Sequence, residues 1–107
     1  MEFKEVEKWI LKNTERYAEK NNLKIDDYFA MLKLSEEVGE LSQAFLVHKR
    51  KSRSSKFKPE KESKKDVAEE LADVISISII LANELGIDLE DALNKKCINK
   101  VRNKNNE

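Results

Sequence analysis

Apolar side chains recur every three or four positions along most of this chain, which is the spacing of helices that bury one face. The first such segment contains Phe3, Val6 and Ile10 among charged residues. An Asn pair ending at Asn22 follows it, and Asn tolerates the left-handed conformation in which many helices end. The pattern therefore predicts a first helix over residues 2–21.

A second helical segment begins at Asp26 or Asp27, either of which is a good N-cap, and runs to about Arg50. Its apolar side chains spread around more than one face, so we expect it to pack on several sides. Gly39 interrupts this helix and costs about 1 kcal/mol relative to Ala. We therefore expect a neighbouring helix or a ligand to approach closely at Gly39.

A third helix is predicted from Ser63, which begins a Ser-Lys-Lys-Asp capping sequence, to about Leu85. Within it, Ile and Ser alternate over residues 75–79, a pattern that also fits a strand. We favour a helix because a helical apolar stripe runs from Val67 to Leu85 and strong helix formers flank the alternating stretch. The extra isoleucines then form a second apolar face, which predicts an oligomer interface.

A fourth helix is predicted from about Leu89 to Asn103. Gly86 is a natural C-cap for the preceding helix, and Asp88 is a natural N-cap for this one. The tail at 103–107 is expected to fray. Four helices without a clear strand predict an all-α fold, a four-helix bundle that assembles into oligomers.

The composition agrees with a single all-α domain over residues 1–107, because two glycines and one proline leave little material for turns. The 21 basic residues balance 21 acidic ones, so no overall field attracts nucleic acid. One cysteine fits a reducing compartment. The longest apolar segment, at 74–82, is too short to span a bilayer, and the N-terminus carries no secretory signal pattern. We expect a cytoplasmic protein without nucleic-acid or membrane partners.

The stretch from His48 to Lys65 is hydrophilic, rich in Lys and Ser, and contains Pro59, the only proline. It predicts a flexible basic connection at about residues 50–64, which is long for a link between helices. Two interpretations stay open. The basic run is either solvated surface or a flap that closes over an anionic ligand.

Two acidic motifs, Glu-Glu-Val-Gly-Glu and Glu-Glu-Leu-Ala-Asp, lie in the second and third predicted helices. Helix geometry places Glu37 and Glu40 on one face, and Glu70 and Asp73 on another. In both helices the acids lie within the apolar stripe. Burying carboxylates costs several kcal/mol each unless they are paired, protonated or bound to a metal. The motifs therefore predict the two halves of a cation site.

Oxygen ligands alone favour Mg²⁺, Mn²⁺ or Ca²⁺ over Zn²⁺. A di-iron bundle needs Glu-x-x-His pairs, and the single histidine, His48, is not in one. Carboxylate-held Mg²⁺ keeps positions for water and phosphates, and a basic fourth helix can hold remaining phosphate charge. The residues thus favour hydrolysis of a phosphate ester or anhydride. The alternative is a helical protein whose acids only pair with its many lysines.

The wording of the motifs, Lys33-Leu-Ser-Glu-Glu-Val-Gly-Glu-Leu41 and Glu69-Glu-Leu-Ala-Asp-Val74, resembles the signature of the MazG-like, all-α nucleoside triphosphate pyrophosphohydrolases. The resemblance covers about residues 25–102. It implies a hydrolase of phosphoric anhydrides that cleaves a (d)NTP between the α- and β-phosphates into NMP and pyrophosphate. It also implies Mg²⁺, with Mn²⁺ as an alternative, a homodimer or homotetramer, and a house-cleaning role in the nucleotide pool.

The resemblance also assigns roles to individual residues. The metal ligands it implies are Glu37, Glu40, Glu70 and Asp73. Glu36 is then a further ligand or a catalytic acid that orients the attacking water, beside Glu37. The phosphate-binding candidates are Lys33, Lys95, Asn99 and Arg102. For the last helix, a spacing based on Lys96 fits equally well.

No base-recognition residue can be assigned, and the aromatic candidates are Trp9 and Tyr28, followed by Tyr17 and Phe29. A Trp such as Trp9 more commonly lies in a core or an interface. Two other classes stay open: a phosphoribosyl-ATP pyrophosphohydrolase-like enzyme, whose second motif is usually worded differently, and a non-catalytic helical module for dimerisation or regulation.

Overall fold

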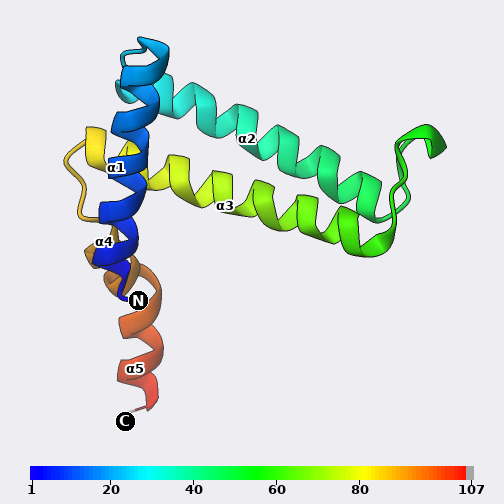
Figure 1. Ribbon diagram of the computed structural model, residues 1–107. Helices are drawn as coiled ribbons and strands as arrows, with labels where there is room; N and C mark the ends of the chain where they lie inside the picture. The colour runs from blue at the N-terminus through cyan, green and yellow to red at the C-terminus, as the bar shows by residue number, and fades with distance from the viewer. Residues whose placement is uncertain (106–107) are drawn as a thin grey trace. The chain divides into compact units, whose positions relative to one another are not determined.

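The computed structural model describes residues 1–105, and this part of the chain is helical without any strand. The all-α prediction is confirmed. None of the described helices is both long and apolar enough to cross a membrane. The elements, in chain order, are α1 (Phe3–Asn21), α2 (Asp27–His48), the 3-10 turn η1 (Ser54–Lys56), α3 (Glu60–Glu84), α4 (Leu89–Leu93), the π turn η2 (Asn94–Ile98) and α5 (Asn99–Asn105) (Figure 1).

Two compact units make up the chain. Residues 28–78, here called the hairpin unit, contain nearly all of α2 and most of α3. Residues 1–27 and those from 79 onward, here called the terminal unit, contain α1, the end of α3, and the helices that follow. That the whole chain is a single domain stays a prediction.

In the hairpin unit, α2 and α3 lie side by side and antiparallel, joined by residues 49–59 (Figure 1). At the joined end, His48 Nδ1 lies 2.7 Å from Ser63 Oγ. About three turns further along both helices, Glu37 and Asp73 face each other. The predicted apolar stripes lie on the facing sides, because their members are all buried or half-buried: Ala30, Leu34, Leu41 and Ala44 on α2, and Val67, Val74 and Ile77 on α3.

The start of α3 corrects the predicted helix boundary. α3 begins at Glu60, directly after Pro59, whose fixed φ favours a helix start. Ser63 is therefore not a cap. It lies inside the first turns of α3, only 2% exposed, and its N–H donates to the Pro59 carbonyl over 3.0 Å. Its hydroxyl bonds to His48 and to the Glu60 carbonyl instead.

The alternating stretch 75–79 is helical, as predicted, and lies within α3. Ser78 Oγ donates to the Val74 carbonyl over 2.8 Å, so this hydroxyl is satisfied within the helix. Side chains from this stretch divide between two environments. Ile77 and Ile79 are buried, whereas Ile75 is 56% exposed, which agrees with the predicted second apolar face.

Gly39 does not have the environment that we expected. It is exposed, and apart from its own stretch of helix no atom of the described residues lies within 4 Å of the position where a Cβ would be. The predicted close approach of a neighbouring helix of this chain was therefore wrong, and the approach of a ligand stays a prediction. In this chain the glycine lowers the helix propensity of α2 without a packing reason in the structure.

In the terminal unit, helix ends follow the predicted capping residues. Asn22 ends α1 in the left-handed conformation, with φ of 52°. Gly86 follows α3 with φ of 67°, which suits a residue without a Cβ. Asp88 Oδ1 accepts a hydrogen bond from the Asp91 N–H over 3.0 Å and thus caps α4. Asp88 also pairs with Lys4 Nζ over 2.9 Å, which joins the start of α1 to the start of α4.

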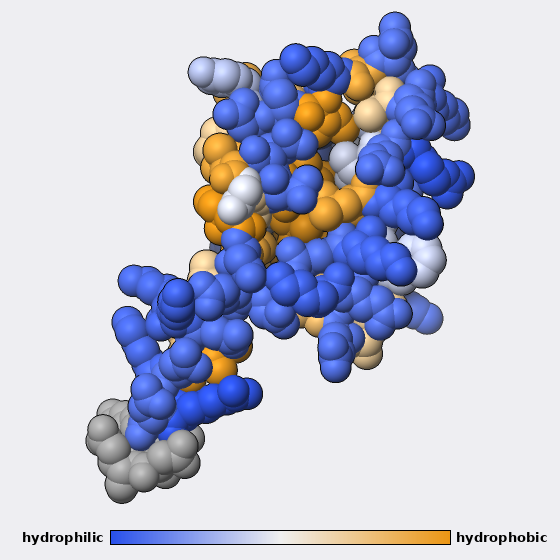
Figure 2. Space-filling view, turned by 90° about the vertical axis from the view of Figure 1, so that its left-hand side faces the viewer, coloured by the Kyte–Doolittle hydropathy of each residue, from blue (hydrophilic) through white to orange (hydrophobic). Residues whose placement is uncertain are grey.

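The predicted fourth helix is present but divided. A π turn, η2, separates α4 from α5, and π turns inserted in α-helices contain an additional residue. α5 continues to Asn105, beyond the predicted end, and residues 106–107 of the predicted frayed tail lie outside the described residues. The surface of α5 is mostly hydrophilic (Figure 2).

Candidate metal centre

Three carboxylates from α2 and α3 converge in the hairpin unit. Glu37, Glu70 and Asp73 each present one oxygen, and these oxygens lie within 4.8 Å of one another. Glu37 is buried, with 9% of the residue exposed, Glu70 is half-buried and Asp73 is exposed. The acidic cluster, as we call these three residues, therefore reaches from the interior of the helix pair to its surface.

Two oxygens of this cluster have no partner. Glu37 Oε2 and Glu70 Oε2 are buried and form no hydrogen bond within the part of the chain that the structure describes. Leaving a polar atom buried without a partner costs about 1–3 kcal/mol, and more for a charged group. Buried oxygens without partners in residues whose carboxylates converge are consistent with a cation site, since a cation bound by these residues would compensate their charge.

The electrostatic environment opposes ionisation of Glu37 and Glu70. Burial is the main cause that raises the pKa of Glu37, and the charges of Glu40 and Asp73 raise it further. Burial also raises the pKa of Glu70, again with Glu40 and Asp73 as the next causes. A divalent cation would offset both the desolvation and the repulsion that disfavour the ionised forms of these two acids.

Glu40 lies at the edge of the acidic cluster. It is half-buried, and together with Glu70 it lines a depression between α2 and α3. The structure does not place it among the three acids whose oxygens lie within 4.8 Å. A role as the fourth metal ligand therefore stays a prediction.

Lys33 lies beside the acids of its own helix. Lys33 Nζ donates to Glu36 Oε1 over 3.1 Å and lies 3.7 Å from Glu37 Oε1. Lys33 thus offers one positive charge to the cluster. Glu36 itself is directed outward, with 56% of its side chain exposed, and the structure does not bring it into the cluster. Its expected role beside the attacking water stays a prediction.

The donor set consists of carboxylate oxygens. Mg²⁺ is commonly held in proteins by one or two carboxylates, together with water and substrate phosphates. The acidic cluster and Glu40 offer enough oxygens for such an ion, and the exposed side at Asp73 leaves room for further ligands. The residues therefore fit a hard divalent cation.

The three predicted phosphate ligands of the last helix lie in the terminal unit. Lys95 is in the π turn, where its Nζ pairs with Asp91 Oδ2 over 3.0 Å. Asn99 and Arg102 lie on α5, and both are exposed. The π turn separates them from α4, so the α-helical spacing that grouped them does not apply unchanged. Their role stays a prediction.

Among the aromatic candidates, Trp9 is 52% exposed on α1, and the ammonium groups of Lys8 and Lys12 each lie 5.6 Å from the centre of its ring. A Trp covered by cations at its surface is not a core residue. Tyr28, on α2, is 78% exposed. Neither observation assigns base recognition, so both residues stay candidates.

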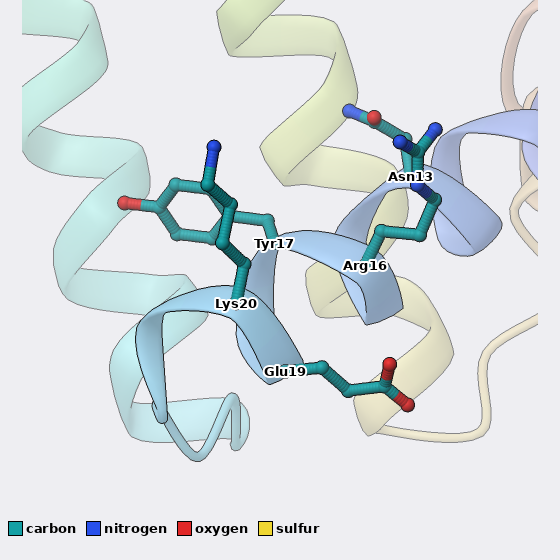
Figure 3. Close-up of a pocket in the computed structure, with 5 residues that line it drawn as sticks. All are labelled: Asn13, Arg16, Tyr17, Glu19 and Lys20. Carbon is teal, nitrogen blue, oxygen red and sulfur yellow. The ribbon is translucent and has the colours of Figure 1, made fainter.

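Tyr17 lines a shallow surface depression on α1 (Figure 3). Its lining side chains, which point in different directions from a single helix, are Asn13, Arg16, Tyr17, Glu19 and Lys20. They do not converge on one point as the acidic cluster does. We therefore give this depression no functional role.

Sequence reasoning missed two features beside the cluster. One is the bond between His48 and Ser63, which ties the end of α2 to the start of α3. The other is the group of residues from the connection, including Lys56 and Phe57, that line the depression next to Glu40. The only local signal was one aromatic residue, Phe57, in an otherwise hydrophilic run.

Comparison with known proteins gives one match. A family model described as the MazG-like family matches residues 33–107, which contain both acidic motifs. No curated protein and no solved structure shows a significant match. The match covers more than half of the chain and includes residues 33–78 of the hairpin unit.

Proposed function

Because the chain belongs to the MazG-like family, which supports a hydrolase of the nucleotide pyrophosphohydrolase type, we propose that it cleaves a nucleoside triphosphate. The substrate is a (d)NTP, cut between the α- and β-phosphates into NMP and pyrophosphate. The reaction depends on Mg²⁺, for which Mn²⁺ can substitute. Such an activity would serve the removal of unwanted nucleotides from the cellular pool.

One observation carries this proposal beyond the family match. The acidic cluster holds two buried carboxylate oxygens without partners, at a place where the surface opens at Asp73. An acidic patch that served only solubility would keep its oxygens in water. Carboxylates that are kept bare near a surface opening suit a site that exchanges a metal–nucleotide complex.

Each residue of the site has a proposed role. Glu37, Glu70 and Asp73 hold the cation, and Glu40 completes its ligands. A bound divalent cation would offset negative charge on the phosphate oxygens. Glu36 orients the attacking water, with Glu37 as the neighbouring catalytic acid, and Lys33 contacts the phosphates. Lys95, Asn99 and Arg102 are the proposed phosphate contacts from the last helix.

The test is a panel of canonical and modified NTPs and dNTPs with Mg²⁺, in which every product is identified. We expect the monophosphate and pyrophosphate. Water carrying ¹⁸O should place the label in the monophosphate, because the attack is on the α-phosphorus. Formation of a nucleoside diphosphate and orthophosphate would refute the proposed bond cleavage.

Variants test the assignment of the site. Asp73→Asn should abolish turnover, because an amide at this exposed ligand position removes a negative charge that a hard cation requires. Glu62→Gln removes an exposed carboxylate elsewhere on the same helix, α3, and should leave turnover unchanged. Equal activity of the two variants would contradict the metal site.

We also propose that the protein acts as a homodimer or homotetramer. The hairpin unit leaves large apolar side chains exposed: Leu32 at 72%, Leu71 at 47% and Ile75 at 56%. Burial of such side chains between copies stabilises an assembly. Light scattering coupled to gel filtration should give a mass of two or four chains, and Ile75→Glu should lower it. A wild-type mass of one chain would refute this part of the proposal.

A further inference from the structure

A depression of about 730 Å³ lies directly beside the acidic cluster, entirely within the hairpin unit. Its walls come from the second half of α2, from the connection 49–59, and from the first half of α3. It shares Glu70 with the cluster and is also lined by Glu40. Its volume is in the range of small-molecule sites, about 300–1,000 Å³.

The depression is lined by side chains of both charges. Its acids come from α2 and α3 and are Glu40, Asp66, Glu69 and Glu70, of which Glu70 belongs to the acidic cluster. The connection contributes Lys56, Ser52 and Ser55, and we call this part of the lining the basic end. A metal-bound polyphosphate has a matching distribution, because the phosphates that the cation does not hold keep their negative charge.

Two lysines line the depression, and of these Lys56 forms no ion pair with a carboxylate of the described residues. Lys58 also lines the depression, but its Nζ pairs with Asp66 Oδ2 over 2.7 Å. This ion pair joins the connection to α3, and the charges of Lys58 and Asp66 cancel each other. Glu69, which also lines the depression, has a partner of its own, because Lys65 Nζ lies 3.8 Å from its Oε1. Lys56 and the two hydroxyls therefore stay available at the basic end, and such groups suit phosphate oxygens.

Local contacts hold the backbone of the connection in place. Lys56 lies in η1, where its N–H donates to the Arg53 carbonyl over 2.9 Å. The next residue, Phe57, is half-buried, and the guanidinium of Arg50 lies 4.9 Å from the centre of its ring. The bond between His48 and Ser63 fixes the base of the connection. A fixed wall loses less conformational freedom on binding than a loose one.

We propose that the basic end of this depression binds the phosphates that extend beyond the metal in a metal–polyphosphate substrate, through Lys56, Ser52 and Ser55. The inference rests on the proposed function for the identity of the substrate. It gives the basic connection a role in binding phosphate, whereas its basic sequence alone fits either solvated surface or contact with an anionic ligand. It also places a phosphate contact within the same unit as the acidic cluster.

The test compares Lys56→Ala with Lys51→Ala, which removes an exposed lysine of the same connection that does not line the depression. Lys56→Ala should raise KM for the Mg²⁺–nucleotide by roughly tenfold or more, as expected for loss of a charge-assisted hydrogen bond, while Lys51→Ala leaves KM unchanged. Ser55→Ala should give a smaller increase. Circular dichroism spectra and melting temperatures should match the wild type, because Lys56 is exposed.

Calorimetric binding of inorganic tripolyphosphate in the presence of Mn²⁺ separates this inference from the proposed function. Weaker binding by Lys56→Ala than by Lys51→Ala supports the inference, whether or not the wild type turns over a nucleotide. If the wild type hydrolyses NTPs but the two variants are alike in KM and in binding, the inference is wrong and the proposed function stands. Absence of tripolyphosphate binding to the wild type also overturns the inference.

Discussion

Replacement of Glu70 by Gln should stabilise the metal-free protein and at the same time remove its stabilisation by divalent cations. The two effects have one cause. Glu70 lies with Glu37 and Asp73 so that their oxygens are within 4.8 Å, and the acidic neighbours and burial raise its pKa. The amide in Glu70→Gln has the shape of the protonated acid and can donate a hydrogen bond to a neighbouring carboxylate.

The magnitude follows from the distances. Two unit charges 4.8 Å apart repel each other by about 3.5 kcal/mol at an effective dielectric constant of about 20. Glu70 is in two such pairs, and water near the exposed Asp73 screens much of this repulsion. We therefore expect Glu70→Gln to gain about 1 kcal/mol, a small part of the unscreened repulsion. This corresponds to a rise in melting temperature of roughly 4–8 °C for a domain of this size class.

Thermal unfolding at pH 8 measures both effects, first in the presence of EDTA and then with increasing MnCl₂. The wild type should gain about 2.7 kcal/mol at a cation concentration one hundred times its Kd. Glu70→Gln should start from a higher melting temperature and gain almost nothing. Glu62→Gln is the control and should follow the wild type. A lower melting temperature of Glu70→Gln in EDTA, or an undiminished Mn²⁺ response, would refute the reasoning.

Four further predictions follow from individual contacts. The metal-free wild type should become more stable as pH falls from 8 towards 5. The raised pKa values of Glu37 and Glu70 mean that the folded state binds more protons than the unfolded state; this gain is complete below the ordinary glutamate pKa of about 4.3 and is lost as pH rises through the raised values. A melting temperature that is constant or falls over this range would contradict this. Lys33→Met should bind Mn²⁺ more tightly in calorimetry, because an ammonium 3.7 Å from Glu37 competes with the cation, yet turn over nucleotide more slowly; weaker Mn²⁺ binding would argue against that competition. Ser63→Ala should lower the free energy of unfolding in urea by about 1–3 kcal/mol, since it leaves a part-buried imidazole nitrogen without its partner, and an unchanged midpoint would show that the bond contributes nothing. Gly39→Ala should raise the same quantity by about 0.5–1 kcal/mol, since nothing in the described structure obstructs the added methyl group; destabilisation would indicate a close neighbour after all.

The sequence predicted those parts of the fold that depend on local chemistry. Asn22, Gly86 and Asp88 end or begin helices as their backbone preferences and side-chain oxygens require. The facing of Glu37 and Glu70 was also predictable, because each acid shares a face with apolar residues that must be buried. Position within a period of 3.6 residues determines this facing.

The connection after α2 could not be predicted in the same way. Arg50 adopts a positive φ of 60°, a conformation for which glycine would be the usual choice. Its guanidinium lies over Phe57, and Lys51 N–H donates to the Leu46 carbonyl over 2.8 Å. These contacts hold the chain in a conformation that its own preferences do not favour. The early start of α3 has a local cause, Pro59, which the capping motif at Ser63 obscured.

The π turn at Asn94–Ile98 has a consequence for comparing this chain with its relatives. A helix with one additional residue turns every later side chain by about 100° from its place in an uninterrupted helix. In an ungapped alignment with a relative that lacks this residue, the counterpart of Asn99 or Arg102 would stand one position away from the residue it corresponds to in space. Deletion of one residue within the turn should therefore be tolerated by the backbone, yet would redirect the whole basic surface of α5. The length of this segment, as much as its composition, determines where its charges point.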